Sequence, residues 1–298
     1  MRLEPLKDDL AQRFGAHRSR LFGVAYRMLG SRADAEDILQ DAYLRWHRAD
    51  TATIETPEAW LVTVVTRLCL DRLRARKQER ELYIGPWLPE PIITGTMESA
   101  EMQLEFANEV SVAFLAMLER LGAEERAAFL LYEVFDYDYA DIAQMLGKTE
   151  AACRQIVHRA RERVRTGRPR YTVPEQNRQL LLEKFLKAAT SGDREAVTAL
   201  LAENVSFISD GGGKVTAALK VLNGAERIGR LYYCIARRHP QLSYRLIRVN
   251  GELGAVHLVE GKLHSVLSFE TTVDQIVAIY VMRNPDKLVG IDVSDYDI

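Results

Sequence analysis

The sequence predicts a multidomain protein in which two all-α helical modules, the second ending in a helix-turn-helix, precede an α+β domain. The chain has 298 residues, which exceeds one average domain. Stretches rich in proline and glycine interrupt the helical periodicity twice, and beyond the second one helices give way to a run of strands. We therefore divide the chain into a module at 1–82, a linker at 83–105, a module at 106–168, a linker at 169–175 and a domain at 176–298.

The first module is expected to be a set of amphipathic helices. Residues 18–29 carry their apolar side chains on one side. Residues 31–34 have the form of a capping box opened by Ser31, and Thr56-Pro57 pairs an N-cap with a proline at the first helical position. The helix after Thr56-Pro57 is apolar early and basic late. The helix after Ser31 has an apolar stripe made of Ala35, Ile38, Leu39, Ala42, Tyr43 and Trp46.

The first linker cannot continue a helix, because prolines stand at positions 86, 89 and 91. Trp87 and Leu88 indicate that it packs against another part of the protein. About twenty extended residues span roughly 65 Å, which exceeds one DNA turn of ~34 Å. The two modules could therefore read separate DNA segments.

The segment from Tyr139 to Arg165 has the pattern of a helix-turn-helix. Ala143 is the small residue at the helix crossing, Gly147 is the turn residue, and Thr149 is the expected N-cap of the second helix. That helix has an apolar stripe of Cys153, Ile156, Val157, Ala160 and Val164 and a polar face of Glu150, Arg154, His158, Arg161 and Arg165. One face can pack while the other enters a major groove, so the pattern favours DNA binding over a solvated cationic surface.

The charge and cysteine content restrict the class of protein. The net charge is −2, whereas a domain that captures DNA unaided is usually strongly basic. We infer that another molecule supplies most of the phosphate affinity. No apolar run approaches the ~20 residues of a membrane span, and the charged N-terminus lacks a signal-peptide core. The 3 cysteines are far apart, which argues against a disulfide framework or a zinc site and fits a reducing, cytoplasmic location.

The C-terminal domain is expected to open with helices and continue with antiparallel strands. Helices are predicted over 178–190 and 194–202, followed by a strand over 205–209. Asn223 should cap a further helix. The remaining strands are predicted over 242–249, 255–259, 263–269 and 276–282, with Asn250-Gly251 as a hairpin turn between the first two.

These blocks, in this order, resemble an extracytoplasmic-function sigma factor, the promoter-recognition subunit of bacterial RNA polymerase. The resemblance spans about residues 10–168 and is carried by ADAEDILQDAYLRW, TPEAWLVTVVTRLCLDRLRARK and the block from Leu118 to Arg161. It implies that residues 1–82 are sigma region 2, which binds core polymerase and the −10 element, and that 106–168 are sigma region 4, which binds the −35 element. The implied partners are the polymerase clamp and flap regions and promoter DNA.

The C-terminal domain resembles the SnoaL-like extension of one sigma-factor subgroup, a cystatin-like cone. Three signatures carry this resemblance: WLPEP from Trp87, DGGGK from Asp210 and NPDKL from Asn284. It implies that the extension tunes sigma activity in cis, with Trp87, Asp210, Lys214, Asn284, Asp286 and Lys287 as the regulatory contacts. A P-loop at 210–214 is not expected, because the spacing is wrong and no helix follows closely.

The resemblance also assigns candidate site residues, each of which has a structural alternative on a solvated or ion-paired surface. Polymerase binding is assigned to Asp37, Gln40, Asp41 and Leu44. DNA binding in the first module is assigned to Arg67, Asp71, Arg72, Arg74, Arg76 and Lys77. In the second module we expect Glu150, Arg154 and His158 to read bases, with Thr149 as the helix cap and Arg161 and Arg165 on phosphates.

No catalytic residue, cofactor or metal ligand is expected. SnoaL-like folds include enzymes, so His239, His257 and His264 with Asp210 could support acid–base chemistry, but the spacing gives no dyad and a small-molecule ligand in the domain is favoured over turnover. Two alternatives remain: a ligand-responsive helix-turn-helix regulator, and a SnoaL-type enzyme fused to a DNA-binding module. A fused regulatory domain indicates a monomer.

Overall fold

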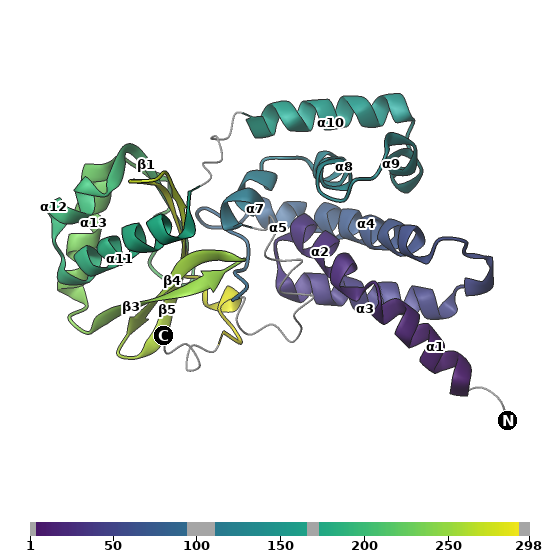
Figure 1. Ribbon diagram of the computed structural model, residues 1–298, viewed down its shortest axis with the longest axis horizontal. Coiled ribbons are helices and arrows are strands. Elements are labelled where there is room, and N and C mark those ends of the chain that lie inside the picture. Colours follow the sequence, from purple (N-terminus) through teal and green to yellow (C-terminus); the bar gives the residue numbers. More distant parts are fainter. Residues whose placement is uncertain (1–3, 94–110, 166–172, 292–298) are drawn as a thin grey trace. The chain divides into compact units, whose positions relative to one another are not determined.

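A computed structural model describes residues 4–93, 111–165 and 173–291. These residues form two compact units (Figure 1), the first made of 4–81 and 115–165 and the second of 82–93, 111–114 and 173–291. The first unit is all helical and the second combines helices with one sheet, so the predicted fold class is confirmed. No helix in the described part of the chain is long and apolar enough to cross a membrane.

The helices of the first unit begin where the local signals predict. Ser31 is the N-cap before α3 and its Oγ accepts a hydrogen bond from the backbone N–H of Asp34 at 3.3 Å. Thr56 and Pro57 open α4 as expected. The helices are α1 (Glu4–Gly15), α2 (Arg18–Leu29), α3 (Arg32–Arg48), α4 (Pro57–Ala75), α5 (Lys77–Glu81), α7 (Val112–Leu118), α8 (Ala123–Glu133), α9 (Tyr139–Leu146) and α10 (Glu150–Arg165), with a short 3-10 turn at Thr51–Thr53.

The two predicted helical modules pack together inside this one unit. Arg126 of α8 is only 3% exposed, and its guanidinium donates to the carbonyl of Met28 at 2.7 Å and to Glu119 at 2.6 Å. Arg20 of α2 donates to the carbonyl of Phe135 at 3.1 Å. Buried arginines that bond to backbone carbonyls fix a packing register, because an unmet donor there costs about 1–3 kcal/mol. The expected 106–110 start of the second module lies outside the described residues.

The second unit is a six-stranded sheet with helices. Its strands lie in the order β2-β1-β6-β5-β4-β3, and every neighbouring pair is antiparallel except β1 with β6. Aromatic rings fill its core, where Phe185 lies edge-on to Tyr232 at 5.1 Å and to Phe269 at 5.7 Å. The elements are α11 (Glu175–Ser191), α12 (Arg194–Ala199), β1 (Leu201–Asp210), β2 (Leu222–Asn223), α13 (Ala225–Arg238), β3 (Leu242–Val249), β4 (Glu252–Val259), β5 (Lys262–Thr271), β6 (Ile276–Met282) and a 3-10 turn at Pro285–Lys287.

Two local predictions in this unit are wrong because strand pairing overrides them. The helix predicted over 194–202 ends at Ala199, and Leu201 instead begins β1, where it pairs with Ile276. Asn223 does not cap α13; it lies in β2, where its Oδ1 accepts from Ser206 Oγ at 3.0 Å, and Gly224 at φ +99° is the N-cap. The four later strands and the Asn250-Gly251 turn, both residues at positive φ, are confirmed.

Residues 83–93 of the first linker fold onto the second unit. Leu88 is only 2% exposed, and Ile93 forms a β-bridge with Val249 at the end of β3. The backbone N–H of Ile92 donates to Asn250 Oδ1 at 3.0 Å, and the N–H of Asn250 returns a bond to Ile92 at 2.8 Å. The expectation that this linker packs against the protein is met for 83–93, while 94–105 and most of the second linker lie outside the described residues.

Candidate functional site

The helix-turn-helix is built by the residues that predicted it. Asp138 caps α9 by accepting from the backbone N–H of Asp141 at 2.8 Å. Gly147 turns the chain at φ +64°, a left-handed conformation that costs glycine little. Thr149 Oγ1 then accepts from the backbone N–H of Ala152 at 3.2 Å, which caps α10. The stripe from Cys153 to Ala160 is buried, so the opposite face of α10 points to solvent.

That exposed face carries the residues predicted to touch DNA, held in place by neighbours. Arg154 pairs with Glu150 at 2.5 Å and lies over the Tyr139 ring at 5.4 Å. Arg161 pairs with Glu133 and lies over the Tyr132 ring at 5.0 Å. The hydrogen bond from Glu133 raises the pKa of Arg161 above its ordinary value, so this guanidinium stays charged. The face also includes exposed His158, while the side chain of Arg165 lies outside the described residues.

The basic end of α4 is only partly available to nucleic acid. Asp34 of α3 is buried, and its carboxylate accepts from Arg72 at 2.8 Å and from Arg76. Arg74 bonds to Asp71 at 3.2 Å, the local pairing expected from the sequence. Lys77 is exposed. Arg72 and Arg76 thus hold α3 to α4 as well as carrying charge, a role that the sequence did not reveal.

Arg67 contacts the helix-turn-helix directly. Its guanidinium donates to the carbonyl of Met145 at 3.0 Å and to that of Gln144 at 3.1 Å. These carbonyls belong to the last turn of α9, where unpaired backbone oxygens and the helix dipole favour a cation. The side chain predicted to serve the −10 element is therefore engaged by the predicted −35 module.

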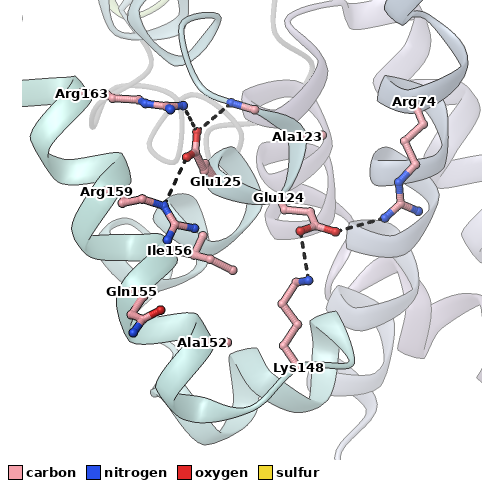
Figure 2. A pocket seen from close by; sticks show the side chains of 11 residues that line it. Arg74, Ala123, Glu124, Glu125, Lys148, Ala152, Gln155, Ile156, Arg159 and Arg163 are labelled. Atoms are coloured by element: carbon pink, nitrogen blue, oxygen red, sulfur yellow. Dashed lines mark hydrogen bonds and ion pairs between the residues drawn. The ribbon is translucent and has the colours of Figure 1, made fainter.

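A groove of about 610 Å³ in the same unit is lined by residues of α4, α8 and α10 (Figure 2). Two acids in the first turn of α8 occupy its centre. Glu124 lies 3.4 Å from Arg74 and 3.0 Å from Lys148. Its neighbour Glu125 accepts from Arg163 of α10 and from the backbone N–H of Gly122 at 3.1 Å, and it forms an ion pair with Arg159 at 3.9 Å. Four cations around the groove thus form ion pairs with two carboxylates of the chain itself.

The residues assigned to polymerase binding share one exposed face of α3. These are Asp37, Gln40, Asp41 and Leu44. Leu44 is a large apolar side chain that is 44% exposed, and the opposite side of the helix, ending at Trp46, is buried. The amphipathic pattern therefore oriented α3 as predicted, while contact with polymerase stays a prediction.

Asp210 joins the linker to the second unit. Its carboxylate is fully buried and both oxygens are used. Oδ1 accepts from Tyr83 at 2.6 Å, and Oδ2 accepts from the backbone N–H of Leu88 and from Lys287, both at 2.8 Å. We call Tyr83, Trp87, Leu88, Asp210, Asn284 and Lys287 the linker clasp.

The NPDKL segment completes the clasp. Lys287 Nζ lies 3.9 Å from the centroid of the Trp87 ring and donates to the carbonyl of Leu88 at 2.5 Å. Asn284 Nδ2 donates to Tyr83 Oη at 2.9 Å. A partly desolvated ammonium over a tryptophan face, with a buried carboxylate as counter-ion, is a strong set of contacts. Three of the signatures that carried the resemblance therefore meet around one carboxylate.

The glycines after Asp210 are required by close approach. A Cβ on Gly212 would lie 2.4 Å from Asn284 Nδ2, and one on Gly213 would lie 2.8 Å from Ile84, and both residues have positive φ. These glycines thus form a tight turn at positive φ. Lys214 follows the turn and pairs with Asp286 at 2.5 Å on the surface. The hydrogen bonds and ion pairs described above join these regulatory candidates to the linker and to one another; contact with the helical modules stays a prediction.

The three histidines of the second unit form a cluster apart from Asp210. The ring of His264 lies 4.7 Å from that of His257 and 5.7 Å from that of His239. The carboxylate of Asp210 accepts from Tyr83, Leu88, Lys287 and Gly212, and none of its described bonds goes to a histidine. Asp210 therefore forms no acid–base pair with a histidine among the described residues.

Two parts of the chain match known sequence families. Residues 14–79 match Sigma-70 region 2, and residues 111–164 match Sigma-70 region 4. The chain is 37% identical over 290 residues to the ECF RNA polymerase sigma factor SigJ of Mycobacterium tuberculosis, covering 93% of this chain and 92% of that protein. The chain belongs to the extracytoplasmic-function sigma factors. The region 2 match of this sigma factor lies within the first unit, as does the region 4 match except for residues 111–114.

Full-length relatives extend the match through the C-terminal domain. The probable ECF sigma factor SigI of M. tuberculosis is 31% identical over 286 residues, covering 94% of this chain and 95% of that protein. The crystal structure of M. tuberculosis SigJ superposes with a TM-score of 0.77 at 35% identity, covering 94% of this sigma factor and 98% of that chain. The SnoaL-like domain is thus part of the shared architecture.

Sequence reasoning missed several residues that organise these sites. Tyr83 precedes the WLPEP signature, and only its hydroxyl marks it as a partner for a carboxylate. Glu124 and Glu125 looked like ordinary first-turn acids on a helix, which is also what their Gly122 capping contact makes them.

Proposed function

We propose that this sigma factor directs core RNA polymerase to promoters and that its C-terminal domain restrains initiation in cis through the linker clasp. The proposal rests on the observation that the buried Asp210 carboxylate accepts hydrogen bonds from the linker with both of its oxygens. Because the linker begins directly after α5, the clasp acts on the tether between the −10 and −35 modules. The face of Asp37, Gln40, Asp41 and Leu44 would contact the polymerase clamp, and promoter DNA would contact α4 and α10.

The restraint follows from the number of linker residues that are bound to the second unit. With residues 83–93 bound there, the other linker residues, 94–105, can span at most roughly 40 Å at ~3.3 Å per residue. Release of the clasp would free residues 83–93 from the second unit, so that the −10 and −35 modules could move farther apart. Meanwhile Arg67 and Arg74 are occupied by α9 and Glu124, which supports an inactive compact form. The equilibrium between the two forms is a population shift.

Reconstitution with core polymerase tests this function. The full chain, a chain ending at Arg168 and a chain ending just before Asn284 are each combined with core RNA polymerase and a pool of genomic fragments. We expect defined transcript starts with the full chain and more transcript from the chain lacking the NPDKL segment. Absence of initiation with all three proteins, together with tight binding of symmetric duplex sites by the free protein, would favour the helix-turn-helix regulator instead.

No reaction is proposed for the C-terminal domain. The acid that an acid–base mechanism would need is Asp210, and its lone pairs are taken by the clasp. The proposal treats the chain as a monomer, because a promoter is asymmetric and the regulatory domain is fused. Light scattering of the purified chain checks that assignment.

A further inference from the structure

A cluster of polar groups in the second unit lies outside the two segments that match sigma regions 2 and 4. It consists of His257 on β4, His264 and Ser265 on β5, Arg283 just after β6 and His239 just after α13. Its members range from partly exposed His239, His264 and Arg283 to His257, which is only 5% exposed. The cluster therefore leads from the surface into the domain.

Some buried nitrogen atoms of this cluster have no described hydrogen-bond partner. Arg283 Nη2 donates to His264 Nε2 at 2.9 Å, which makes His264 a neutral ring with its proton on Nδ1. That Nδ1–H is buried and has no partner among the described residues, and the same holds for Arg283 Nε–H and for His257 Nε2. His257 Nδ1 lies 3.3 Å from Ser265 Oγ. Buried polar groups are nearly always satisfied, so three open positions in one cluster need an explanation.

The charge of the cluster is also uncompensated. Arg283 bonds to His264 and to the carbonyl of Thr216, and no described carboxylate pairs with it. Burial together with the positive charge of nearby Arg238 lowers the pKa of Arg283. Burial also lowers the pKa of His257 to about 3 and of His264 to about 4, so both rings are neutral near pH 7. The cluster thus offers two N–H donors and one cation.

We propose that Arg283, His264 and His257 form a binding site for a small organic carboxylate. A carboxylate group can accept from Arg283 Nε–H and neutralise the guanidinium, which a neutral or cationic molecule cannot do. His264 Nδ1–H lies on the side of the ring away from Arg283 and is a separate donor for another acceptor atom. The Tyr244 ring, 4.9 Å from His257, supplies an apolar flank for the organic body. Arg283 is followed directly by Asn284 of the linker clasp, so a carboxylate bound at Arg283 would change the strength of the clasp. Only that consequence rests on the proposed function.

Binding is tested on the full chain without polymerase, with benzoate as the probe. The protein is labelled at the histidine ring carbons, and its 6 histidines are followed by NMR. We expect benzoate to shift the His257 and His264 signals in a saturable way and to leave His158 unmoved. Isosteric but uncharged benzamide, and inorganic sulfate, should not produce these shifts.

The variant Arg283→Gln should weaken benzoate binding by at least about tenfold, since it removes a charge-assisted contact. Arg227→Gln removes the same charge from an exposed position of α13 and should leave binding unchanged. The site is refuted if wild-type protein shows no saturable shift, if benzamide or sulfate acts like benzoate, or if the two variants behave alike. Should Arg283→Gln lose its folded spectrum, the benzoate, benzamide and sulfate titrations of the wild-type protein decide the question alone.

Discussion

The Asp210 carboxylate accepts a hydrogen bond at 2.8 Å from the backbone N–H of Leu88, a residue that precedes it by 122 positions in the chain. This contact is fully buried, and Lys287 shares the same carboxylate oxygen. A segment that the sequence marks as a tether is thereby part of the C-terminal domain. Under the proposed function, the contact links the reach of the promoter-binding modules to the stability of that domain.

The clasp should contribute strongly to the stability of the second unit. Asp210→Asn leaves the largely buried ammonium of Lys287 without a counter-ion, and we expect it to lower the free energy of unfolding by about 3 kcal/mol. Urea unfolding followed by circular dichroism measures this change. Asp286→Asn makes the same substitution in the exposed pair with Lys214 and should cost less than about 1 kcal/mol. If both variants lost the same free energy of unfolding, the clasp would stabilise the unit no more than the surface pair does.

Glu124 and Glu125 should weaken DNA binding by the free protein. The double variant Glu124→Gln/Glu125→Gln releases the four cations of the groove, so we expect tighter binding to promoter duplex. The slope of log K against log salt should steepen by about 2–4, since each new phosphate contact adds ~0.9. Fluorescence anisotropy across a salt series gives both values. Asp136→Asn/Asp141→Asn makes the same charge change at exposed positions and should alter the slope by less than about 1.

Arg154 and Arg161 should differ in their effect on sequence preference. Arg154→Ala should cost about 1–3 kcal/mol at one base position of the −35 element, because a bidentate base contact is lost. Arg161→Ala should weaken binding to all sequences alike. Holoenzyme binding to a set of single-base promoter variants separates the two outcomes, and a uniform loss from both variants would argue against base reading by Arg154.

The histidine cluster predicts a pH dependence of stability. His257 is neutral in the folded protein because burial, the neighbouring His264 and His239, and Arg283 lower its pKa to about 3. The unfolded chain takes up a proton near pH 6.5, so stability is full above that pH and is lost progressively as the pH falls toward 3. His257→Gln should reduce this loss by about 3 kcal/mol between pH 6.5 and 4. Urea titrations at each pH test it, and an unchanged pH profile would contradict the burial of a neutral ring.

Local signals predicted most of the fold. Gly147, Thr149 and Asn250 act through their own backbone or a near neighbour, so the helix-turn-helix and the hairpin could be located from the sequence. The errors arose where pairing with a strand far away in the sequence determines the local structure. Asn223 has the composition of a cap, but pairing with β1 places it in a strand.

The candidate sites were predictable only in part, for the same reason. The exposed faces of α3 and α10 follow from helical periodicity. The partner of a charged side chain cannot be predicted from that periodicity. The pairing of Arg72 with Asp34, the hydrogen bonds from Arg67 to α9 and the clasp around Asp210 all join residues far apart in the chain. Spacing along the sequence carries no information about such pairs.

Transcription initiated by core RNA polymerase with clasp variants tests the central claim most directly. Wild-type protein, Asp210→Asn, Tyr83→Phe and the exposed control Asp274→Asn are compared on a promoter found by the reconstitution described above. The account predicts several-fold more transcript from both clasp variants than from wild-type protein and no change with Asp274→Asn. Transcript from Tyr83→Phe and Asp210→Asn at or below the wild-type level, with the folded spectrum retained, would contradict it.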